Sequence, residues 1–148
     1  MTPQQITLVR QSFALVAPVA PQAAAMFYEN LFTADPALRP LFRGDMVQQG
    51  NLLMRMIQGA IGMLDNPELL LPTLHALGAR HLAYGVKEPH YGTVGRALLR
   101  TLNEAMGDAF TPDVADAWAT LYDVVSRTMQ EGAQAAAAAD ARSAALVV

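Results

Sequence analysis

Proline and glycine divide this chain into segments, and almost every segment repeats its apolar residues with the period of an α-helix. The first segment shows the pattern clearly. Thr2 is followed by Pro3, a favoured first helical residue, and Ile6, Val9 and Phe13 then form one stripe. The sequence contains no convincing strand and no sustained heptad repeat. The chain is therefore predicted to be all-α, an irregular packing of about seven or eight helices of unequal length.

The same signals place the other helix boundaries. Pro18 and Pro21 end the first helix, and Asp35 is expected to cap a short helical turn. Pro72 restarts or kinks a helix that begins near Pro67. In the segment from about 46 to 64, five residues share a predicted face: Gln49, Leu53, Met56, Ala60 and Met63. The remaining boundaries are predicted at Gly44, at Gly85 as a C-terminal cap, at Pro89 and at Thr111.

Composition and charge restrict the class of protein. With 148 residues, of which 53% are hydrophobic and 16% charged, the chain has the size and composition of one globular domain. Its formal net charge of −3 gives no basic surface for nucleic acid, and it has no run of about 20 apolar residues to cross a membrane. The absence of cysteine excludes disulfides and thiolate metal sites, and no segment reads as a signal peptide. We therefore expect a cytoplasmic protein without nucleic-acid or membrane partners.

His81 is one of three histidines and lies in the segment LGARHLAYGV. Leu74, Leu77 and His81 follow helical spacing, so the imidazole projects from the same face as two leucines and needs a partner for its nitrogens. Spacing alone leaves two interpretations open: a core histidine bonded to a backbone carbonyl, or an axial ligand of a metal or haem. Zinc is disfavoured because there is no cysteine, no second histidine within one turn and no HExxH motif.

Four stretches of the chain resemble the globin family: LVRQSF, FYENLFTADPALRPLF, LHALGARHLAYGVKEPHYGTVGRALL and GDAFTPDVADAWATLY. The resemblance runs from Leu8 to about Met129 and is to single-domain bacterial haemoglobins and the globin domain of flavohaemoglobins, with neuroglobin almost as similar. It implies a globin fold around a pocket for haem b. Residues 1–132 would form this globin domain, and residues 133–148 an alanine-rich extension that either continues the last helix or frays.

The resemblance also assigns the pocket residue by residue. His81 matches the proximal histidine that binds the haem iron, and Phe42 matches the phenylalanine that packs on the porphyrin. Tyr28 and Gln49 take the two distal positions, where they would stabilise bound dioxygen, and Leu53 would face the ligand. Five further positions match haem contacts, although by pattern alone each reads as plain core: Leu77, Val86, Tyr91, Val94 and Val125. Arg80 would either reach a haem propionate or be a solvated charge.

Two features of the resemblance concern how the pocket is supported. Ala24 and Gly50 match small residues that let two helices cross closely, so that the tyrosine reaches over the iron. Tyr91 matches a tyrosine that, together with a glutamate, holds the proximal histidine of flavohaemoglobins. By register, the glutamate position falls on Ala133, and Glu131 is two residues away. The resemblance therefore does not extend to this glutamate.

Two functions follow from the resemblance. The first is a binding protein that holds dioxygen reversibly and with high affinity at a pentacoordinate ferrous haem, for storage, transport or delivery. The second is an enzyme, a nitric oxide dioxygenase that converts nitric oxide and bound dioxygen to nitrate and relies on a separate reductase. The expected small ligands are dioxygen, nitric oxide and carbon monoxide, and the expected assembly is a monomer or a weak dimer.

Overall fold

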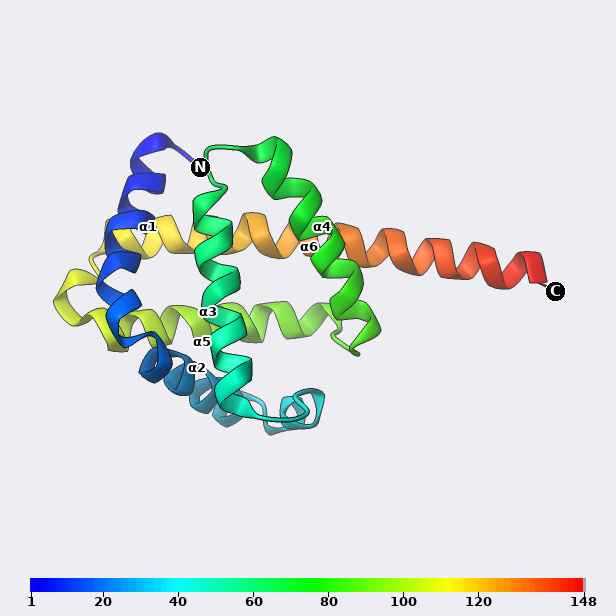
Figure 1. The fold of residues 1–148 in the computed structure, drawn as a ribbon, viewed down its shortest axis with the longest axis horizontal. Helices are drawn as coiled ribbons and strands as arrows, with labels where there is room; N and C mark the ends of the chain where they lie inside the picture. The colour runs from blue at the N-terminus through cyan, green and yellow to red at the C-terminus, as the bar shows by residue number, and fades with distance from the viewer. Residues whose placement is uncertain (148) are drawn as a thin grey trace.

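The computed structural model describes the backbone of residues 1–147 and the side chains of residues 1–144, and this part of the chain is helical without a strand (Figure 1). Six α-helices follow one another within it: α1 (Pro3–Val16), α2 (Ala20–Ala34), α3 (Met46–Gly62), α4 (Pro67–Ala83), α5 (Glu88–Met106) and α6 (Pro112–Val147). Three short 3-10 segments lie between them: η1 (Ala17–Val19), η2 (Pro36–Leu41) and η3 (Gly107–Ala109). The all-α prediction is confirmed.

The number of α-helices is lower than the seven or eight predicted, for two reasons. Pro72 lies inside α4 without ending it, so this segment forms one helix. A break at Pro72 would have given two. This proline is only five residues after Pro67, so it removes one backbone hydrogen bond near the helix start, where the loss is tolerated best. In addition, the short segments 17–19, 36–41 and 107–109 have 3-10 rather than α-helical geometry.

Several helix ends form from the local signals that predicted them. The Thr2 hydroxyl accepts the Gln5 N–H at 3.1 Å, and the Gln5 side chain accepts the Thr2 N–H at 3.0 Å, which completes a capping box. Asp35 caps η2 and Thr111 caps α6 in a similar way, each with a side-chain oxygen that accepts a backbone N–H. These three predicted boundaries are confirmed.

The last helix continues beyond the predicted end of the globin domain. α6 runs from Pro112 to Val147 without a break, and Figure 1 shows its C-terminal part extending past the other helices. Alanine is the strongest helix former, which accounts for regular helix in a stretch with few packing partners. The domain division at residues 132 and 133 stays a prediction, and Val148 lies outside the described residues.

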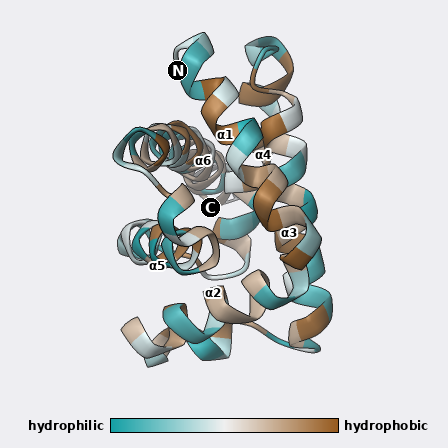
Figure 2. Cartoon of the chain, turned by 90° about the vertical axis from the view of Figure 1, so that its left-hand side faces the viewer, coloured by the Kyte–Doolittle hydropathy of each residue, from teal (hydrophilic) through white to brown (hydrophobic). Residues whose placement is uncertain are grey.

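The buried side chains form two apolar clusters. Figure 2 shows α5 and α6 nearly end on at one side of the molecule, and α3 and α4 from the side at the other. The larger cluster centres on Trp118 of α6, whose indole N–H donates to the Ser12 hydroxyl of α1 at 2.8 Å. The smaller cluster centres on Phe27, Tyr28 and Leu31 of α2. The core therefore consists of a larger and a smaller cluster.

The predicted face of α3 is only partly buried. Met56 on that face is 42% exposed, and the other four residues that share it are half-buried. The deeply buried side of α3 carries Gly50 and Ile61 instead, because the helix packs against α2 at Gly50. The period of apolar residues indicated that α3 is a helix, but it did not identify the side that packs most tightly.

Candidate functional site

His81 lies in the last turn of α4, and its side chain is half-buried. Its Nδ1 is 2.9 Å from the backbone carbonyl oxygen of Leu77, one turn earlier in the same helix. A carbonyl oxygen only accepts hydrogen bonds, so Nδ1 carries the proton and Nε2 keeps its lone pair in the neutral ring. Burial lowers the pKa of His81; the Leu77 hydrogen bond opposes this effect and the Arg80 charge adds to it. The neutral imidazole is therefore favoured.

The chain reverses direction directly after His81. Gly85 has a φ of +95°, in the left-handed region where glycine is favoured because it has no β-carbon. The Val86 N–H then donates to the His81 carbonyl at 3.0 Å, which ends α4 in a Schellman motif. The predicted glycine cap is confirmed, and it fixes Val86 against the last turn of α4.

Tyr28 on α2 is 6% exposed, and its hydroxyl lies at the first turn of α3. The hydroxyl donates a hydrogen bond to the backbone carbonyl of Gln49, at 3.4 Å. The two helices come this close at Gly50, where a β-carbon would lie 2.9 Å from the β-carbon of Ala24. The close crossing that was expected from these two small residues is present, and it brings Tyr28 and Gln49 together.

Aromatic packing holds the Tyr28 ring in place. The ring meets Phe42 edge to face at 5.3 Å between centroids and stacks on Phe32 at 5.9 Å. The Arg39 guanidinium lies 5.5 Å from the Phe32 centroid and donates to the Phe42 carbonyl at 2.8 Å. Burial raises the pKa of Tyr28 to about 12, and hydrogen bonding by the Gln49 side chain offsets part of this rise. The Tyr28 hydroxyl is therefore a protonated hydrogen-bond donor at neutral pH.

The other predicted contacts divide between the two apolar clusters. Leu53 and Val94 pack with Tyr28 and Phe42 in the smaller cluster. The larger cluster contains four more of the predicted residues: Leu77, Val86, Tyr91 and Val125. Tyr91 is buried, whereas the remaining apolar candidates keep partly exposed side chains and Arg80 is exposed. The structure thus places some candidates with Tyr28 and others with the helix that carries His81.

Three residues next to these groups were not singled out from the sequence. Leu98 packs against both clusters, and it lies one turn after Val94 on α5, so helical spacing would have found it. Gly78 on α4 and Gly132 on α6 lie where those two helices make close contact. Their role depends on a neighbour that is distant in the sequence, and no local pattern reveals it.

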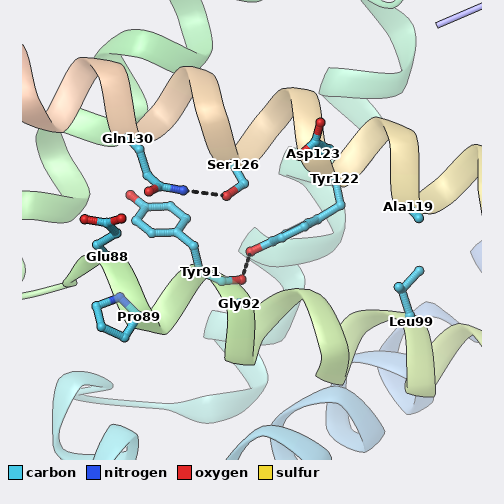
Figure 3. Close-up of a pocket in the computed structure, with 10 residues that line it drawn as sticks. All are labelled: Glu88, Pro89, Tyr91, Gly92, Leu99, Ala119, Tyr122, Asp123, Ser126 and Gln130. Atoms are coloured by element: carbon cyan, nitrogen blue, oxygen red, sulfur yellow. Dashed lines mark hydrogen bonds between the residues drawn. The ribbon is translucent and has the colours of Figure 1, made fainter.

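Tyr91 lines a separate pocket of about 550 Å³ between α5 and α6 (Figure 3). Gln130 and Ser126 line the same pocket and are joined by a 2.8 Å hydrogen bond. The Tyr91 hydroxyl is buried without a hydrogen-bond partner in the part of the chain that the structure describes, and burial raises the pKa of this residue. Glu131 is exposed and does not line this pocket, whereas its neighbour Gln130 does. None of the other predicted site residues lines this pocket.

The other two histidines have different surroundings. His75 is exposed on α4, and His90 accepts the Lys87 N–H with its Nδ1 at 2.9 Å at the start of α5. Within residues 1–147, no three histidine or carboxylate side chains gather into a metal site. In the same range, no helix has the length and hydropathy that a bilayer crossing needs.

Comparisons with known proteins identify the family of the chain. A family model described as Globin matches residues 25–129. A flavohemoprotein of Rhodopirellula baltica is 31% identical over 126 residues, which are 82% of this chain and 31% of that protein. A flavohemoprotein of Bordetella parapertussis is 33% identical over 99 residues, which are 65% of this chain and 25% of that protein. The chain therefore spans about a third or less of the length of these relatives.

Solved structures share the fold. A bacterial globin from Campylobacter jejuni has a TM-score of 0.78 at 22% identity, over 90% of this chain and 96% of that one. A hexacoordinated haem protein from an anhydrobiotic tardigrade has a TM-score of 0.82 at 17% identity, with the same coverage. At these identities the likeness concerns the fold alone. Because the family model matches more than half of its residues, the chain belongs to the globin family.

Proposed function

We propose that this globin binds haem b and that His81 is the axial ligand of its iron. The observation that carries the proposal is the 2.9 Å hydrogen bond between His81 Nδ1 and the Leu77 carbonyl, because it orients the ring and leaves Nε2 for the metal. The lowered pKa of His81 adds support, since a protonated imidazole cannot bind a metal. The names of the relatives, flavohemoprotein and haem protein, support the choice of cofactor.

The apolar residues near the site fit a flat and largely apolar group. Phe42 and Leu53 belong to one cluster and Leu77 and Val86 to the other, and all four keep partly exposed side chains. These half-buried apolar side chains provide surface that a bound cofactor would cover, and covering it would be favourable. Arg80, which is exposed beside His81, would bind a propionate group.

Reversible binding of dioxygen is the chemistry that ferrous haem would supply at this position. Tyr28 would donate its hydroxyl proton, and Gln49 its amide, in hydrogen bonds to a ligand that gains negative charge. Leu53 would keep water away from the same space. A hydrogen bond to a charged partner contributes about 1.5–3 kcal/mol, so each donor slows ligand release by roughly tenfold or more. The expected result is a high dioxygen affinity.

Gln49 also favours an open sixth coordination position. An amide is a weaker ligand for iron than an imidazole, and the Gln49 side chain of α3 lies within hydrogen-bond reach of Tyr28. The Tyr28 hydroxyl, with its pKa raised to about 12, is not a phenolate at neutral pH and so does not compete for the iron. We therefore propose a pentacoordinate ferrous resting state.

The donor role of Tyr28 is tested by Tyr28→Phe and Gln49→Leu in the haem-loaded protein. Each substitution removes one hydrogen bond to a charged ligand, so dioxygen dissociation is expected to accelerate by about tenfold or more. Carbon monoxide gains little charge, and its dissociation rate is expected to change far less. Stopped-flow and flash photolysis measure both rates. Equal effects on the two gases would show that the substitutions act by opening the pocket and not by removing a donor.

The protonation state of Tyr28 gives a prediction for the cofactor-free chain. Tyr28 is expected to ionise near pH 12, against about 10 for an unperturbed tyrosine. Because the pKa is raised in the folded state, its contribution to stability is full below pH 10 and is lost between about pH 10 and 12. The difference between near-ultraviolet titrations of the wild type and Tyr28→Phe isolates this group. A difference curve with its midpoint near 10 would contradict a buried, protonated donor.

Nitric oxide dioxygenation is a second candidate, favoured by the 31% identity to a flavohemoprotein over 82% of this chain. In that reaction nitric oxide, dioxygen and one electron combine to give nitrate, and the haem held by His81 would supply the electron. A separate reductase would then supply one electron for each nitrate formed.

Turnover separates the two functions. The loaded protein is given nitric oxide, dioxygen and a reductase with its electron donor, and nitrate is counted per protein. Binding as the main role predicts about one nitrate per protein and then a stalled ferric form. Many nitrates per protein, with a matching consumption of reductant, would establish the enzyme and displace the binding function.

A further inference from the structure

The backbones of α4 and α6 are in direct contact, and two glycines allow it. A β-carbon on Gly78 of α4 would overlap the backbone carbonyl group of Met129 on α6. A β-carbon on Gly132 of α6 would likewise overlap the backbone carbonyl group of His75 on α4. The two contacts are reciprocal, because each helix supplies one glycine and one carbonyl. Both glycines are buried. We refer to these four residues as the α4–α6 glycine contact.

No side-chain adjustment can relieve this contact, since backbone atoms lie on both sides of it. The contact residues are three apart on each helix, 75 and 78 on α4 and 129 and 132 on α6, and they pair in opposite order along the chain. Two pairs, one turn apart, define both the separation of the helices and their position along each other. A side chain at either glycine would therefore have to move a whole helix.

Any change in the position of α4 at this contact also changes the position of His81. His81 follows Gly78 by three residues, within one turn of the same helix. Its Nδ1 is bonded to the carbonyl of Leu77, the residue before Gly78, so the imidazole moves together with the turn that Gly78 occupies. A displacement of α4 at the glycine contact is therefore also a displacement of Nε2.

We propose that Gly78 and Gly132 are positioning residues for His81, because their contact sets the distance and angle at which the imidazole meets the haem iron. This inference rests on the proposed haem ligation by His81. It gives Gly132 a role beyond marking the start of an alanine-rich stretch, since α6 at this point is the surface that holds the proximal helix in place. It also predicts that substitutions at the two glycines, on different helices, act in the same direction.

The test compares Gly78→Ala and Gly132→Ala with the wild type, using the haem-loaded full chain. Gly59→Ala is the matched control, because Gly59 is also a helical glycine but a β-carbon there would meet nothing within 4 Å. The readouts are the iron–histidine stretching vibration of the reduced protein, by resonance Raman spectroscopy, and the rate of haem transfer to apomyoglobin. Circular dichroism verifies that each variant is folded.

Both contact variants are expected to shift the iron–histidine vibration in the same direction and to lose haem about tenfold faster, while Gly59→Ala behaves as the wild type. Folded contact variants with an unchanged vibration and unchanged haem loss would overturn the positioning role. A wild type that takes up no haem would contradict the proposed function instead, so the two failures are distinguishable.

A measurement on the wild-type apoprotein covers the case in which the alanine variants do not fold. Amide hydrogen exchange at residues 77–82 of α4 is expected to be as slow as exchange at the facing turn of α6, because the two turns open together. Exchange of this part of α4 that is much faster than that of α6 would show that α4 opens on its own, and would overturn the proposal without reference to haem.

Discussion

The hydrogen bond between His81 Nδ1 and the Leu77 carbonyl is the interaction on which the proposed site depends. It lies within one turn of α4, so the helix itself selects the tautomer and aims Nε2 away from its own backbone. The Schellman motif at Gly85 then ends the helix directly after His81 and fixes Val86 beside it. The ligand is thus oriented by its own helix, and only the position of that helix is left to the rest of the fold.

The two sides of the site are built by the same means, a close helix crossing beside a polar residue. On the α3 side, Gly50 lies against Ala24, and its neighbour Gln49 is brought to the hydroxyl of Tyr28. On the α4 side, Gly78 lies against the α6 backbone within one turn of His81. The atoms at a helix crossing limit how closely two helices approach. In each case a glycine at the crossing allows the close approach that sets the position of a nearby functional side chain.

Local features of the fold could be read from the sequence, and non-local ones could not. Caps such as Thr2 and the glycine turn at Gly85 depend on residues within a few positions, so their signals are complete in a short window. The close approach of α4 and α6 at Gly78 and Gly132 depends on residues far apart in the sequence, which no local pattern contains. The same applies to the buried side of α3 at Gly50.

In the candidate site, too, the sequence predicted local features but not the contacts between distant helices. A lone histidine among leucines left two interpretations open, and the resemblance to globins chose between them. The structure adds what neither could supply: the protonated nitrogen of His81, the hydrogen bond from Tyr28 to the backbone of Gln49, and Tyr91 lining a separate pocket between α5 and α6. These depend on how helices distant in the sequence pack together.

The most direct test of this account is the visible absorption spectrum of the haem-reconstituted protein, ferric, reduced and with carbon monoxide, for the wild type, His81→Ala and His75→Ala. His75 is the matched control because it is an exposed histidine on the same helix. The account predicts a strong Soret band and a five-coordinate reduced spectrum for the wild type and His75→Ala, and a lost or much weaker band for His81→Ala. A wild type that binds no haem, or a His81→Ala variant with an unchanged spectrum, would contradict it.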